Sequence, residues 1–256
     1  MTPNLLIRRF APWLFLLGLF TLWEVVCDTF SVTDLVLPKP TRVLTVLAQK
    51  HAALWPHAAQ TLFTTLTGFF VGALLGILLG VTIGLSRLAY DVTYPLLVAF
   101  NSIPKVAVVP IFVIWFGSGT VPAILTSVAI CVFPVVVNVA TGLTTTPPET
   151  RDILRALGAT RFEILWRVEL PGALPYLFAS LKIAVPLAFV GSVLSETVAG
   201  NRGIGSVMIL ATSNFDVPLV FAGFFILAAM GVALYAVCAL LEARFCDWAR
   251  RSGGVR

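Results

Sequence analysis

The sequence predicts an all-α protein that crosses a membrane several times. Of its 256 residues, 59% are hydrophobic and only 11% are charged, and the mean hydropathy is +0.98. So few charges cannot cover the surface of a water-soluble domain. The apolar stretches are continuous over about 20 residues, the length that a helix needs to cross a bilayer, and do not alternate with the period of two typical of barrel strands. We therefore expect about six transmembrane helices in one domain.

The first expected span follows Arg8 and Arg9 and carries Glu24 and Asp28 near its outer end. A cleaved signal peptide is the alternative, but no small-residue cleavage site follows this segment. After it we expect an outer segment, residues 31–57, with an amphipathic helix from Thr41. The six spans are expected at residues 10–30, 58–86, 92–116, 121–143, 172–198 and 217–241.

Five glycines repeat at four-residue spacing through the second span. Positions four apart lie nearly on one face of a helix, so this face is a groove that another backbone can approach closely. Glycine is frequent in membrane helices, but frequency alone does not account for five in register. We predict a helix-packing seam made of Gly68, Gly72, Gly76, Gly80 and Gly84.

Three polar residues of the spans are candidates for a substrate pathway. Lys105 lies inside the third span, where Pro104 and Pro110 interrupt the helix. A lysine inside a membrane is costly, so we expect a water-lined path, a carboxylate or an anionic substrate beside it; extension of its side chain to the membrane surface is the alternative. Asn101 and Glu196 complete the candidate set. A glycine-rich loop follows Glu196 but is no phosphate cradle, because no strand precedes it.

The most polar part of the chain is the loop at residues 144–171. It holds four arginines and four acids, whereas the 43 residues before Glu149 carry no charge. We expect two short helices, with Gly158 at the corner between them and the second ending at Pro171. They would form a protruding knob, although an ordinary cytoplasmic loop can also have this composition.

The distribution of basic residues predicts the orientation in the membrane. If both termini and the polar loop are cytoplasmic, that side holds 11 of the 17 lysines and arginines and the outer side holds four, as the positive-inside rule requires. This also explains the net charge of +5 without nucleic acid as a partner. The 11 are Arg8, Arg9, Arg87, Arg151, Arg155, Arg161, Arg167, Arg244, Arg250, Arg251 and Arg256.

Several function classes lack their residues in this sequence. There is no G-x-x-x-x-G-K-[ST] string for a nucleotide, and no Ser-His-Asp or His-Cys set for hydrolysis. His51 and His57 and the four cysteines show no metal-ligand spacing. We expect no metal site and no enzyme activity in this chain. The alternatives that remain are an ion-coupled carrier or channel, and a membrane enzyme that uses Glu196 or Asp28 as an acid.

The polar loop resembles the EAA loop of the membrane subunits of bacterial ABC importers. That pattern is EAA, three residues, G, nine residues, I-x-L-P, and the spacing here is the same from Asp152 through Gly158 to Pro171. Asp-Ile-Leu stands where Glu-Ala-Ala is usual, and Val168 replaces the isoleucine. The string LPKP at residues 37–40, the third span and the segment after Glu196 are similar to the nitrate, sulfonate and taurine branch of that family.

The resemblance implies a type I importer permease fold in the bacterial cytoplasmic (inner) membrane. The partners it implies are a second copy of this chain, two ABC ATPase subunits that hold ATP and magnesium, and a periplasmic or lipid-anchored solute-binding protein; this chain itself would hold no cofactor. It implies a small solute such as nitrate, a sulfonate, taurine or a small organic compound. The residues expected to couple to the ATPase are Asp152, Arg155, Ala156, Leu157, Gly158, Ala159, Thr160, Phe162, Leu170 and Pro171.

Overall fold

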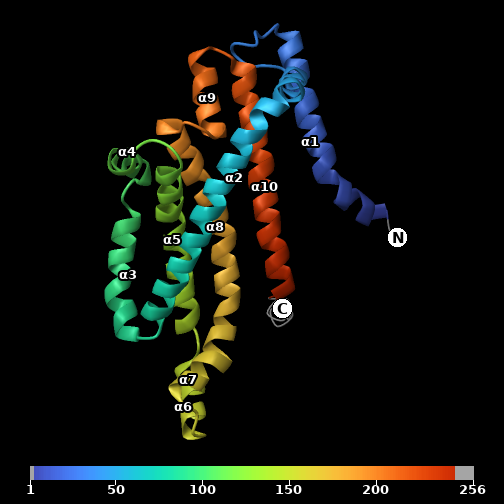
Figure 1. The fold of residues 1–256 in the computed structure, drawn as a ribbon. Coiled ribbons are helices and arrows are strands. Elements are labelled where there is room, and N and C mark those ends of the chain that lie inside the picture. The colour runs from blue at the N-terminus through green and yellow to red at the C-terminus, as the bar shows by residue number, and fades with distance from the viewer. Residues whose placement is uncertain (1–2, 246–256) are drawn as a thin grey trace.

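The computed structural model describes residues 3–245, and every regular element in that range is helical (Figure 1). Five helices there are long and apolar enough to cross a membrane, and a sixth span results if one bent pair is counted as one. The elements are α1 (Pro3–Thr29), α2 (Pro40–Gly84), α3 (Arg87–Asn101), η1 (Lys105–Val108), α4 (Val109–Phe116), α5 (Thr120–Thr144), α6 (Pro148–Ala156), α7 (Arg161–Ile164), η2 (Leu165–Glu169), α8 (Leu170–Ala199), α9 (Ile204–Ser213) and α10 (Val217–Phe245).

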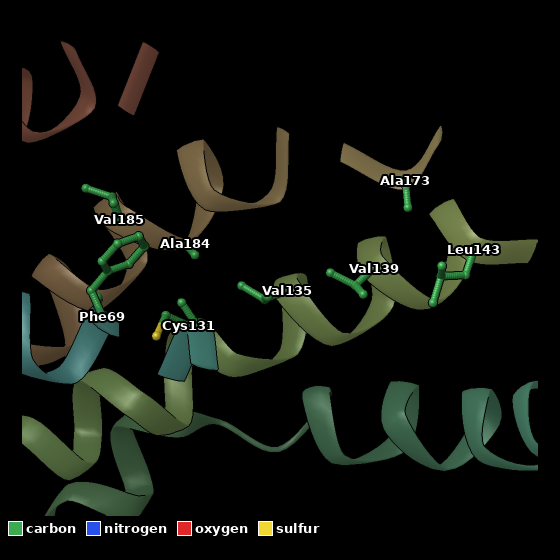
Figure 2. Packing of buried hydrophobic residues seen from close by; sticks show 10 residues of the cluster. Phe69, Cys131, Val135, Val139, Leu143, Ala173, Ala184 and Val185 are labelled. Atoms are coloured by element: carbon green, nitrogen blue, oxygen red, sulfur yellow. The ribbon is translucent and has the colours of Figure 1, made fainter. Parts of the chain in front are cut away.

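The core of the molecule lies among α2, α5 and α8, which pack side by side (Figure 1). Figure 2 shows Val135, Val139 and Leu143 of α5 pointing toward the neighbouring helices, with Phe69 on α2 and Ala184 on α8. α5 carries no charged side chain, and it packs against α2 on one side and α8 on the other.

The five glycines of α2 lie directly against α5. A Cβ atom added at Gly68 would be 2.3 Å from the Cβ of Ser127, and one at Gly76 would be 2.6 Å from the Cβ of Val135. The facing residues of α5 are Ser127, Cys131, Val135, Val139 and Leu143, each 59 residues after its glycine. Because this offset is constant, the two helices run in the same direction and their four-residue ridges stay in register.

The second span begins earlier than expected. We predicted a separate helix from Thr41 and a span from residue 58, but α2 is one helix of 45 residues that continues through Pro56. Proline removes one backbone hydrogen bond, yet apolar contacts hold the helix on both sides of it. Leu54 packs with Ile204 of α9 before the proline, and Ala58 packs against the same cluster after it.

The prediction that the second short helix ends at Pro171 was wrong. The chain stays helical from α7 to Ala199, with the π-helical turn η2 immediately before α8. Pro171 lies in the first turn of α8, and the wider turn before it accommodates a residue that has no N–H to donate. The apolar helix α9, which follows the glycine-rich loop, was also not foreseen.

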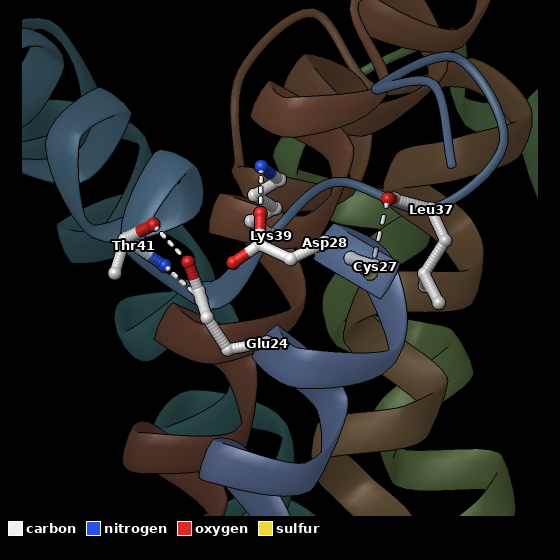
Figure 3. A network of polar contacts seen from close by, with 6 residues as sticks. All are labelled: Glu24, Cys27, Asp28, Leu37, Lys39 and Thr41. Atoms are coloured by element: carbon white, nitrogen blue, oxygen red, sulfur yellow. Dashed lines mark hydrogen bonds and ion pairs between the residues drawn. The ribbon is translucent and has the colours of Figure 1, made fainter. Parts of the chain in front are cut away.

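The outer end of α1 is fixed by polar contacts with the turn before α2, as Figure 3 shows. The backbone N–H and the hydroxyl of Thr41 donate to Glu24 at 3.1 and 2.6 Å. Lys39 donates to Asp28, and this hydrogen bond raises the pKa of the lysine. The acids that we expected near the outer end of the first span therefore attach α1 to the LPKP turn.

The glycine seam generates a stability prediction. We expect Gly76→Leu to lower the free energy of unfolding by about 1–3 kcal/mol, because the added side chain forces α2 away from α5. Thermal unfolding in detergent measures this. The matched control is Gly18→Leu in α1, where an added Cβ meets no atom within 4 Å. Equal melting temperatures for the two variants would contradict the seam.

Candidate functional site

The polar loop folds into a compact projection beyond the ends of the spans (Figure 1), here called the knob, residues 148–169. Gly158 turns the chain between α6 and α7 with φ +87°, a backbone conformation that L side chains rarely adopt. The N–H groups of Gly158 and Ala159 donate to the carbonyl groups of Arg155 and Leu154 at 2.9 and 3.0 Å. The glycine thus satisfies the last carbonyls of α6 and sets the direction of α7.

The second helix of the knob starts with a capping box. The hydroxyl of Thr160 accepts from the backbone N–H of Glu163 at 3.3 Å. In return, the N–H and hydroxyl of Thr160 donate to the Glu163 carboxylate, both at 2.9 Å. These hydrogen bonds lower the pKa of Glu163, because they favour its charged form. The box lets a new helix start at Arg161, only three residues after Gly158.

Arg151 attaches the knob to the bundle. Its Nε lies 2.7 Å from Oε1 of Glu169, and its Nη2 donates to the carbonyl of Leu143 at 2.9 Å. Both charged side chains are mostly buried, so the pair loses less to solvent than an exposed one. The contact joins α6 to the last turn of α5 and to the residue that precedes α8. We singled out neither Arg151 nor Glu169 as a site residue, because nothing in their sequence spacing shows that they meet.

The tip of the knob carries large apolar side chains on its surface. Ile153, Leu157 and Phe162 are 62%, 79% and 68% exposed. Apolar side chains gathered on an otherwise charged projection are typical of a protein-binding surface. Ile153 was not among the predicted contacts; its place in the EAA position was the available signal.

The structure places the ten predicted coupling residues in two groups. Leu170 and Pro171 lie in the first turn of α8 and are partly buried, and Leu170 packs against the core. The others belong to the knob, where only Ala159 is partly buried. The exposed ones are Asp152, Arg155, Ala156, Leu157, Gly158, Thr160 and Phe162.

The third span is broken where Asn101 and Lys105 lie. Its two halves, α3 and η1 with α4, are bent by 76°. The Lys105 ammonium donates to the backbone carbonyl and to the side-chain oxygen of Asn101, at 2.8 and 2.7 Å. Within residues 3–245 no carboxylate lies within 4 Å of it, so the expected carboxylate partner is not found there. The lysine instead neutralises the carbonyl end of α3.

Glu196 does not join these two residues. Its carboxylate is buried and accepts from the hydroxyl of Thr61 at 2.8 Å and from the N–H of Gly205 at 3.1 Å. A Cβ at Gly203 would lie 2.2 Å from the carboxyl carbon of Glu196. The glycine-rich loop after α8 is therefore shaped around this carboxylate, which connects α2, α8 and the start of α9.

His, Cys, Asp and Glu side chains do not gather in one place in the part of the chain that the structure describes. No group of three or more His, Cys, Asp and Glu is placed to hold an ion there. His57 accepts from the N–H of Gly203 at 3.1 Å, and Cys27 and Cys131 are buried and free. Cys246 and the tail arginines Arg250, Arg251 and Arg256 lie outside the described residues.

A bundle of five or six membrane-spanning helices with one polar knob has the architecture of a multi-pass membrane permease. A family model matches residues 72–246, more than half of the chain; its description is "Binding-protein-dependent transport system inner membrane component". The chain belongs to this family. It is therefore the transmembrane permease subunit of an ABC importer, a transport protein of the inner membrane and not an enzyme, and it works with an ATPase and a binding protein.

Individual relatives are similar over nearly the whole chain. A probable ABC transporter permease protein of Haemophilus influenzae is 34% identical over 90% of this chain and 94% of the relative. The riboflavin transport system permease protein of Chloroflexus aurantiacus is 35% identical over 91% and 88%. The formylaminopyrimidine transport permease protein of Halalkalibacterium halodurans is 32% identical over 95% and 98%.

Further comparisons confirm the branch and the fold. The taurine transport system permease protein of Escherichia coli is 30% identical over 90% of this chain and 86% of the relative, as the resemblance to the nitrate, sulfonate and taurine branch predicted. The structure of the MetNI methionine ABC transporter in an inward-facing conformation matches with a TM-score of 0.60 over 75% of this chain and 94% of the other, at 19% identity. The type I permease fold is thereby confirmed.

The capping box generates a pH-dependent prediction. We expect Glu163→Ala to speed amide exchange at residues 160–164, because the helix start loses its carboxylate acceptor. The pKa of Glu163 is lowered from 4.5, so this contribution is complete above pH 4.5 and disappears as the pH falls through the lowered pKa. Hydrogen exchange at matched pH values measures it, with Glu149→Ala in α6 as the control. Unchanged exchange in Glu163→Ala at neutral pH would contradict the capping role.

Proposed function

We propose that the knob is the surface through which this permease contacts its ATPase subunits. The observation that carries the proposal is the group of exposed apolar side chains at the tip of the knob, beside the corner at Gly158. The knob lies outside the spans, and its sequence has the spacing of the EAA loop. The tip has exposed side chains to bury, and the corner needs a glycine for its backbone conformation. The positive-inside distribution supports a cytoplasmic position for the knob, where ATP is present.

The contacts at the base of the knob support a mechanical role. Arg151 joins the knob to the ends of α5 and α8, and helical backbone continues from α7 into α8. A displacement of the tip is therefore passed to two helices of the core as a rigid-body motion. ATP binding would bring two knobs together and open the pathway outward, and product release would reverse this.

The proposed assembly contains two copies of this permease, two ATPase subunits and one solute-binding protein on the outer side. ATP and magnesium belong to the ATPase subunits, and this chain requires no cofactor of its own. An ion-coupled carrier, a channel or a membrane enzyme would need neither the knob nor an ATPase. Dependence of transport on ATP separates these classes.

The docking role predicts the effect of a charge at the corner. We expect Gly158→Asp to reduce both ATPase recovery in co-purification and solute uptake by roughly ten-fold or more, because a left-handed residue with a side chain costs about 1–2 kcal/mol and a charge enters the contact. Membrane insertion should be unchanged.

The matched control for this experiment is Gly117→Asp. Gly117 also has a positive φ, +77°, and an added Cβ also meets no atom within 4 Å, but it lies in the turn between α4 and α5, far from the knob (Figure 1). Undiminished solute uptake in Gly158→Asp would contradict the coupling role of the knob. An equal loss of uptake in Gly158→Asp and Gly117→Asp would contradict it as well.

For the substrate we propose a small organic solute, with a nitrogen heterocycle favoured over an inorganic anion. Support comes from relatives named for formylaminopyrimidine and riboflavin, which are 32% and 35% identical, whereas those named for nitrate and bicarbonate are 28% and 26% identical over less of the chain. Lys105 and Asn101 at the break of the third span offer donors and an acceptor for such a solute. Glu196 is used within the fold and is not proposed to line the pathway.

The substrate proposal predicts ATP-dependent uptake of a labelled heterocycle by proteoliposomes that contain the permease, its ATPase and its binding protein. Lys105→Gln should lower the rate, because it removes the charge at the break, and Lys105→Arg should preserve it. Uptake of nitrate without uptake of any heterocycle would contradict the substrate class. A rate unchanged in Lys105→Gln would remove this residue from the pathway.

A further inference from the structure

A hollow of about 400 Å³ lies between the knob and the turn that joins α2 to α3. Three arginines line it, Arg151, Arg155 and Arg161, and among the described lining residues Glu169 is the one acid. Leu85 and Leu88 line the same space and are largely exposed. We call this space the basic hollow.

The charges of the basic hollow are not balanced within the described residues. Arg151 is neutralised by Glu169 at 2.7 Å, but Arg155 has only an exposed contact of 3.6 Å with Asp152. Arg161 has no ion-pair partner within residues 3–245. Arg155 and Arg161 therefore line one space without a buried acid partner, and the positive N-terminal end of α3 lies at the same hollow, because its N-cap Ser86 lines it too. An anion with several acceptor oxygens, such as a phosphate group, suits this set of donors.

An apolar groove of about 410 Å³ lies next to the basic hollow. Its lining is entirely apolar and includes Val81 of α2, Trp166 of η2 and Leu174 of α8. Neighbouring residues line the two spaces: Val81 lies one turn before Leu85 on α2, and Trp166 directly follows Leu165, which lines the basic hollow. Together the basic hollow and the apolar groove offer cationic side chains beside an apolar surface.

The depth of the two spaces matches that of a lipid. The basic hollow begins where α2 ends at Gly84 and lies close to Leu143, in the last turn of α5, which is the depth expected for lipid headgroups beside these spans. The apolar groove is lined by the last turns of α2 and the first turns of α8, where the acyl chains of a surrounding bilayer are expected. Basic pockets at the cytoplasmic ends of spans are suited to anionic headgroups.

We propose that the basic hollow and the apolar groove together bind one anionic phospholipid. Its phosphodiester lies between Arg155 and Arg161, and an acyl chain follows the groove past Trp166. The bound lipid would link the knob to the turn between α2 and α3. A free phosphate would fill the basic hollow alone, and a carboxylate of the ATPase would leave the groove empty. This site does not depend on the docking role of the knob.

The test is native mass spectrometry of the full-length permease alone, purified in mild detergent and titrated with phosphatidylglycerol or phosphatidylcholine. We expect one phosphatidylglycerol to be retained in preference to phosphatidylcholine. Arg161→Gln should weaken retention about five-fold, the effect of one basic side chain near an anionic lipid, and Arg161→Lys should restore most of it. The matched control is Arg167→Gln, because Arg167 is also exposed in the knob but lines a different hollow, with Glu163.

Four outcomes would overturn the proposal. These are equal retention of the two lipids, retention unchanged in Arg161→Gln, and release of the lipid by millimolar inorganic phosphate, which would identify a free-phosphate site. The fourth is displacement of the lipid by added ATPase together with loss of ATPase recovery in Arg161→Gln, which would assign the hollow to the partner protein. Lipid retention is measured without ATPase, so this result can be interpreted even if the docking proposal fails.

Discussion

The close approach of α2 and α5 is the contact on which the rest of the structure depends. Five glycines on one face of α2 meet five residues of α5 at the same four-residue spacing, and the side chains of α5 leave no room for a side chain at the glycine positions. Inside a membrane the hydrophobic effect does not drive helices together, so close van der Waals packing has to do so. This contact creates the core against which α8 also packs, and it fixes where the ends of α2 and α5 lie. The knob follows the end of α5 in the chain and is attached there through Arg151 and Leu143.

The knob shows how a membrane protein can combine a rigid base with an exposed tip. At its base, Arg151 and Glu169 form an ion pair shielded from solvent, which holds α6 against α5. At its tip, Gly158 and the capping box of Thr160 and Glu163 close one short helix and start the next within a few residues. The large apolar side chains of the tip, Ile153, Leu157 and Phe162, remain exposed at the surface. A surface of this kind can receive a partner without first being reorganised.

Polar groups inside the spans are used mainly to define the fold. Glu196 organises the glycine-rich loop through hydroxyl and backbone donors, and Lys105 neutralises the end of a broken helix. In a membrane an unsatisfied polar group is costly, so each of these residues is found beside a partner. Isolated polar residues in a transmembrane sequence are therefore not by themselves evidence of a shared site, as the separation of Glu196 from Asn101 shows.

The sequence alone determined the class of protein, the helical multi-pass fold, the glycine face and the corner at Gly158, because each depends on local properties: apolar length, four-residue periodicity and the spacing of polar residues. Only the tertiary structure decided which helix the glycines meet, that α2 continues through Pro56, and that helical backbone continues past Pro171 into α8. These outcomes depend on contacts between residues far apart in the chain, such as Leu54 with Ile204 and Arg151 with Leu143. Such contacts override local signals, because the packing and hydrogen bonds they supply outweigh the loss of one backbone hydrogen bond at a proline.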